Sequence, residues 1–188
     1  MSSLDMIYDT LLALDAERAR PPVHAWHPTR TGRIDIRIAA DGLWYHEGAP
    51  IRRTTLVRLF ASILRLDPEG YCLVTPAERL FVTVDDAPFI AVDFEIKGTG
   101  LDQRVLFVTN VGDAVPLDDA HPLRVGGHVD APRPYVMVRD GLEARISRAV
   151  FYRLVDLAVA RDRPDAPAGE GDVISIRSAG SWFDLGTV

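Results

Sequence analysis

Two adjacent arginines, Arg52 and Arg53, stand where the sequence predicts the start of a helix. A helix N-terminus carries partial positive charge and favours anions, so cations placed there need compensation. Either acidic side chains compensate them, or the guanidinium groups and the free backbone N–H groups together hold a bound anion. Arg148 repeats this placement at the start of a second predicted helix. Solvated arginines are the commoner explanation of such a pattern, and a bound anion is the functional interpretation that we carry forward.

Aromatic residues precede the first of these helices. Trp44, Tyr45 and His46 lie on a predicted strand, and alternation places Trp44 and His46 on one face with Tyr45 on the other. An aromatic surface beside a cationic helix start would suit a nucleotide-like ligand. The alternative is that the strand is half buried and these side chains belong to an ordinary hairpin.

Further polar residues stand at the ends of predicted strands. Asp85 and Asp86 form a turn, where paired carboxylates could act as acid and base or simply turn the chain. Thr109 and Asn110 end another strand, where they could face a cleft or form an Asx turn. Of these residues, we include Asp86, Thr109 and Asn110 in the predicted ligand site.

No short catalytic signature is present in the sequence. It contains no Gly-rich phosphate loop, no GxSxG elbow and no HExxH motif. His24 and His27 flank a tryptophan in a proline-rich stretch without a nearby carboxylate, and Cys72 is the single cysteine. We therefore predict no metal site, no cofactor and no intrachain disulfide.

The composition is that of a globular protein. The chain has 188 residues, of which 47% are apolar and 26% charged, with a formal net charge of −6. An acidic chain is a poor candidate for binding nucleic acid or anionic lipid. The sequence has no apolar run of transmembrane length, and its first residues include acids where a signal peptide needs cations. These features predict a soluble cytoplasmic protein.

The elements that must position the candidate residues form two series. In the first, residues 33–38 alternate strictly, residues 39–42 turn the chain, and residues 53–65 have the periodicity of an amphipathic helix. Strand-like runs follow at 71–75, 79–84 and 88–96.

The second series has the same order. A strand is expected around residues 103–110, whereas Gly126-Gly127 and the proline-rich residues 130–134 are loop-like. A hairpin turn is expected at Asp140-Gly141, a helix follows Ser147, and a final hairpin surrounds Ala179-Gly180.

The two series predict an α+β fold with an internal duplication. Asp41-Gly42 matches Asp140-Gly141, and Ile51 matches Ile146 when four residues are deleted from the second copy. Each related small unit would hold a β-hairpin, an amphipathic helix and further antiparallel strands. We expect a peripheral N-terminal helix over residues 1–20, a first unit over 21–97 and a second unit over 98–188.

Three segments carry a resemblance to a known family. The stretches IDIRIAADGLWYHEGAPIRRTTLVRLFASIL, YCLVTPAERLFVTVDDAPFIAVDF and TNVGDAVPLDDAHPLRV resemble the proteobacterial domain-of-unknown-function family 1285. The resemblance covers roughly residues 24–185. It implies a duplicated α+β fold, a second domain superficially like a pleckstrin-homology fold, and a nucleotide-like ligand at the domain interface with a role in signalling. It brings no assigned catalytic residues.

The leading hypothesis is a small ligand-binding or sensory protein, not an enzyme. An anionic, nucleotide-like molecule would bind at the interface of the two units, a common place for small-molecule sites. The predicted site comprises Trp44, His46, Arg52, Arg53, Asp86, Thr109, Asn110 and Arg148. One alternative is an enzyme of unknown class acting on a phosphorylated small molecule. Another is a protein-interaction module, which would display an exposed apolar groove or a sheet edge to a protein partner.

Overall fold

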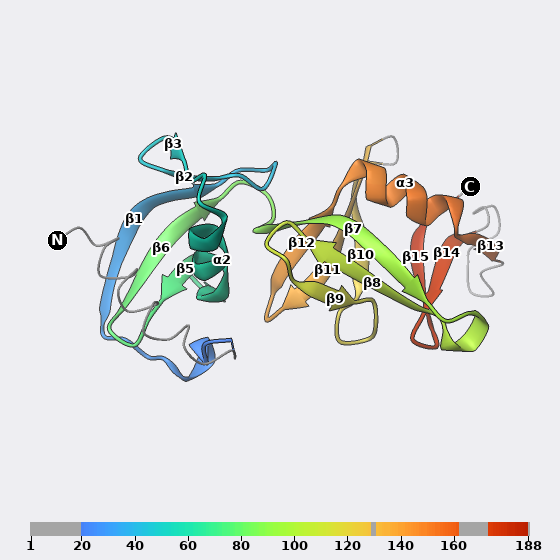
Figure 1. The fold of residues 1–188 in the computed structure, drawn as a ribbon, viewed down its shortest axis with the longest axis horizontal. Coiled ribbons are helices and arrows are strands. Elements are labelled where there is room, and N and C mark those ends of the chain that lie inside the picture. The colour runs from blue at the N-terminus through green and yellow to red at the C-terminus, as the bar shows by residue number, and fades with distance from the viewer. Residues whose placement is uncertain (1–19, 129–130, 162–172, 188) are drawn as a thin grey trace. The chain divides into compact units, whose positions relative to one another are not determined.

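The chain divides into two compact units, Met1–Asp86 and Ala87–Val188, in a computed structural model (Figure 1). The structure describes residues 20–128, 131–161 and 173–187. The helix predicted over residues 1–20 lies, apart from Arg20, outside the described residues. Each unit is described by itself below.

The first unit is built around a six-stranded mixed sheet. Its order is β3-β2-β1-β6-β5-β4, in which β1 and β6 run parallel and the other neighbours antiparallel (Figure 1). The elements in chain order are η1 (Val23–Ala25), β1 (Arg30–Ile38), β2 (Trp44–His46), β3 (Ala49–Pro50), α2 (Thr54–Ser62), β4 (Leu64–Asp67), β5 (Gly70–Val74) and β6 (Glu78–Val84).

The core of the first unit lies between this sheet and α2. Ile36 and Ile38 of β1 are opposite His46 and Trp44 of β2, and both isoleucines are buried, as the strict alternation predicts. Phe60 of α2 is also fully buried and stacks on Trp44, with 6.3 Å between the ring centroids.

The first helix is shorter than its periodicity predicts. The apolar pattern runs to residue 65, but α2 ends at Ser62 and the chain enters β4 at Leu64. Ile63 and Leu64 are both buried at this junction. The helical spacing of apolar residues therefore continues past the end of α2 and into β4. Pairing of β4 with β5 replaces the last predicted turn of helix.

The second unit has a six-stranded sheet, a helix and a smaller sheet. The orders are β10-β11-β12-β7-β8-β9 and β13-β14-β15, and β12 runs parallel to β7. Its elements are β7 (Phe89–Lys97), η2 (Gly100–Asp102), β8 (Arg104–Thr109), β9 (Ala114–Pro116), β10 (Leu123–His128), β11 (Ala131–Arg139), β12 (Leu142–Ile146), α3 (Arg148–Asp156), β13 (Val159–Arg161), β14 (Val173–Ser178) and β15 (Ser181–Thr187).

A buried serine connects the two sheets of the second unit. The Ser178 hydroxyl donates to the Leu117 carbonyl (2.6 Å) and accepts from the backbone N–H of Val105 (2.9 Å). Gln103 adds a bond from its side-chain amide to the Arg177 carbonyl (2.6 Å). These bonds fix the β14-β15 hairpin against β8.

The fold is α+β with an internal duplication, as predicted. Each unit contains a six-stranded sheet with one parallel pair, and each follows a hairpin with a nine-residue helix. The two units differ in which strand of the hairpin forms the parallel pair. In the first unit it is β1, the first strand of its hairpin, and in the second unit it is β12, the second strand of its hairpin.

The division of the chain falls before β7, whereas the sequence placed it between residues 97 and 98. β7 pairs with β8 and β12, so it belongs to the second unit. The expected loops at Gly126-Gly127 and before residue 134 are instead parts of β10 and β11. The predicted tight turns are present, with positive φ at Asp140, Gly141, Ala179 and Gly180. No described helix is long and apolar enough to cross a membrane.

Candidate functional site

The start of α2 exposes a group of donors. Arg53 occupies the N-cap position with an extended backbone, and its side chain does not cap the helix. The first turn has no acidic residue, and Arg52, Arg53, Thr54 and Thr55 are all exposed. The first N–H groups of a helix lack intrahelical acceptors, so backbone, hydroxyl and guanidinium donors lie together here.

Among the described residues, no acid compensates these two arginines. Within the part of the chain that the structure describes, neither guanidinium forms a hydrogen bond or an ion pair. Residues 48–66 contain no aspartate or glutamate, although they include four arginines. The local charge is therefore positive in a chain of net charge −6.

Trp44 and His46 lie close to this helix start along the chain. The Ile51 backbone N–H donates to the Trp44 carbonyl (2.7 Å), which holds the segment before Arg52 against β2. Trp44 is 1% exposed and its ring lies against Phe60, so it faces the core and offers no open stacking surface. Its indole Nε1–H is buried and has no hydrogen-bond partner within the residues that the structure describes. His46 shares that face of β2 but is half-buried.

The second unit holds three of the other predicted residues at one end of β7. The Asn110 backbone and side chain exchange bonds with Ile90 (2.8 and 3.0 Å), while the Ser147 N–H donates to the Ala91 carbonyl (3.1 Å). Thr109 and the start of α3 are thereby brought to the same strand end. Thr109 is buried, and its hydroxyl accepts from the Asp113 N–H (2.9 Å), so it closes the turn that leads to β9. The Asn110 side chain bonds to Ile90 and does not form the Asx turn given as one alternative.

Arg148 and Asp86 complete the predicted set. Arg148 is the first residue of α3 and is exposed, but this helix is capped, since the Ser147 hydroxyl accepts from the Val150 N–H (3.4 Å). Asp86 is half-buried and is the last residue of the first unit. Asp85, before it, accepts an ion-pair bond from Arg37 (2.6 Å).

A cluster of ionic residues in the first unit was missed by sequence reasoning. Arg65 holds Asp67 through two bonds (2.6 and 2.9 Å), and Arg79 adds a third (2.8 Å). Arg65 also donates to the carbonyls of Val23 and Trp26 (2.8 and 2.9 Å), tying the proline-rich segment to β4. The two-residue spacing of Arg65 and Asp67 is the signal for one strand face, but the predicted helix extended to residue 65 and hid it.

The electrostatics of this cluster are those of a structural ion pair. Hydrogen bonds from Arg65 hold the pKa of Asp67 down at about 2, against the burial that opposes this. Burial raises the pKa of the neighbouring Cys72 thiol to about 11. A protonated, buried thiol is a poor nucleophile. No three metal-ligating side chains gather into a possible metal site among the described residues.

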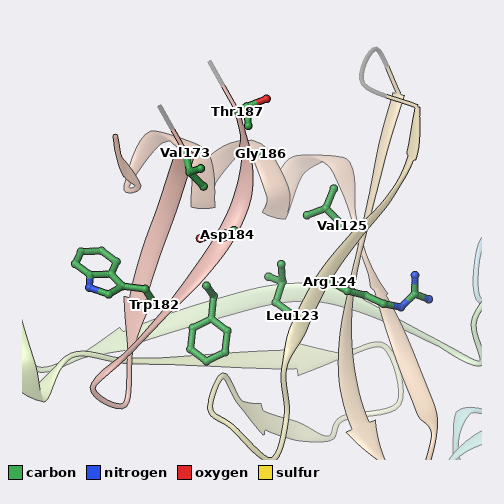
Figure 2. A pocket seen from close by; sticks show the side chains of 9 residues that line it. Leu123, Arg124, Val125, Val173, Trp182, Asp184, Gly186 and Thr187 are labelled. Carbon is green, nitrogen blue, oxygen red and sulfur yellow. The ribbon is translucent and has the colours of Figure 1, made fainter. Parts of the chain in front are cut away.

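The second unit contains a pocket that no sequence motif indicated. Its volume is about 430 Å³, and it lies between β10 and β15, with Leu123, Val125, Val173 and Asp184 in its lining (Figure 2). β10 includes Gly126-Gly127, which the sequence predicted to be loop-like. The edge strand that makes this wall was therefore not fully predictable.

Comparison with known proteins identifies the family. The model of the N-terminal domain of DUF1285, a domain of unknown function, matches residues 21–87, and the model of the C-terminal domain of the same family matches residues 88–185. The chain is similar to the crystal structure of a DUF1285 family protein from Silicibacter pomeroyi DSS-3, with 44% identity, a TM-score of 0.81 and 95% of each chain covered. It is also similar to a DUF1285 family protein from Shewanella baltica OS155, with 30% identity, a TM-score of 0.52, and 64% of this chain and 90% of that chain covered. A search of the curated proteins finds no match. Two domain models that together span most of its length show that this chain belongs to the DUF1285 family.

Proposed function

We propose that this chain is a binding protein for a small anionic ligand, and that the start of α2 supplies the anion-binding groups. The observation that carries the proposal is the pair of exposed arginines, Arg52 and Arg53, at a helix N-terminus without side-chain cap or acidic partner among the described residues. Backbone N–H groups, the helix dipole and guanidinium forks all favour a phosphate or carboxylate there.

The family resemblance extends this proposal to a nucleotide-like ligand and a role in signalling. A cytoplasmic location and a pleckstrin-homology-like second unit belong to the same proposal. Since Trp44 is buried against Phe60, the base of such a ligand would contact other surfaces than the Trp44 ring.

A thermal-shift screen tests the anion site. Pyrophosphate, inorganic phosphate and nucleoside mono-, di- and triphosphates are added to the wild type and to the Arg52→Ala/Arg53→Ala double variant. A ligand at about 100 times its dissociation constant should add roughly 2.7 kcal/mol of stability, which raises the melting temperature by several degrees. We expect this shift to vanish in the double variant and to weaken with added salt.

The matched control is Arg33→Ala. Arg33 is exposed on β1 and, within the described residues, also has no acidic partner, so the variant removes one surface cation of the same kind. Its ligand-induced shift should equal that of the wild type. A shift that survives in the double variant, or a saturating set of anions that stabilises nothing, would contradict the proposal.

A further inference from the structure

We draw no further inference here: the strongest candidate, the apolar groove between β7 and α3 that Phe94, Ile96 and Leu157 line, carries nothing because nothing in the structure shows what covers it.

Discussion

The ionic cluster of Arg65, Asp67 and Arg79 makes the stability of the first unit depend on pH. The pKa of Asp67 is lowered to about 2 in the folded chain, from an ordinary 3.8, chiefly by hydrogen bonds from Arg65. The ionised carboxylate therefore stabilises the fold above about pH 4, and this contribution is lost as the pH falls from about 4 to about 2. The shift corresponds to about 2 kcal/mol.

We expect Asp67→Asn to lower the free energy of unfolding by at least this amount at pH 7, because Arg65 also loses its carboxylate partner. The check is urea unfolding of both proteins at pH 7 and pH 2.5. The difference between them should shrink at the lower pH. An equal difference at both values would mean that the loss comes from packing and not from charge.

For single residues, the sequence predicted which face of a strand a side chain occupies better than it predicted what the side chain does. The strict alternation of residues 33–38 identified Ile36 and Ile38 as core residues. Trp44 was included in the predicted ligand site because alternation shows on which face of the strand it lies. Alternation does not show how deeply that face is buried. Burial depends on α2 placing Phe60 over that face, and no local pattern contains this packing. The partners of Asp67 lie on two different strands, so its environment was equally hidden.

The two helices differ in how they begin. Ser147 caps α3, whereas Arg53 leaves the N-terminus of α2 uncapped. Substituting Arg53 by serine should stabilise the free protein by about 1 kcal/mol, because serine supplies the missing acceptor for a backbone N–H. The same change should weaken anion binding, since it removes a guanidinium from the proposed site.

Melting temperatures with and without pyrophosphate measure both effects in one experiment. Ser147→Ala is the matched opposite, and should lose about 1 kcal/mol of stability without affecting the anion. If Arg53→Ser destabilises the free protein, the arginine has a structural role at this position and the anion proposal loses its main support.

Element boundaries show where local sequence information ends. The helical period continued across Ile63 and Leu64 because both residues are buried, one at the helix end and one in β4. Glycines and prolines in β10 and β11 were expected to form loops. β10 tolerates its glycines because it is an outer strand, in which the ladder makes fewer demands on the backbone. In β11, Pro132 and Pro134 lie beyond the residues that pair with β12, so their missing N–H groups break no ladder bond on that side.

Over the whole molecule, each unit has a core of its own. Phe60 is fully buried in the first unit, and Phe107 and Ser178 are fully buried in the second. Ser178→Ala would leave the Val105 N–H without its acceptor, which should cost about 1–3 kcal/mol. Phe60→Ala should cost about 3–5 kcal/mol through the cavity it leaves.

Hydrogen exchange followed residue by residue distinguishes the two units. Ser178→Ala should lower protection in β8 and β14 and leave β5 and β6 unchanged, and Phe60→Ala should produce the reverse pattern. Loss of protection throughout the chain in both variants would show that the units unfold as one.

The repeat of hairpin and helix predicted the duplication, but the partner of β7 could not be predicted because its pairing with β12 is not local.

The parallel pair in each sheet also bears on how the chain is made. The inner strand β1 gains its second neighbour only after β6, the last strand of its unit, has been synthesised. In the same way, β7 gains its second neighbour only after β12 has been synthesised. A ribosome that delivers the chain from its N-terminus therefore releases β1 and its hairpin long before the sheet can close. During that interval the hairpin exposes Ile36, Ile38 and Trp44, and non-local closure of this kind is slow. Nascent chains halted before residue 78 should consequently engage chaperones, and those extended past residue 86 should escape them.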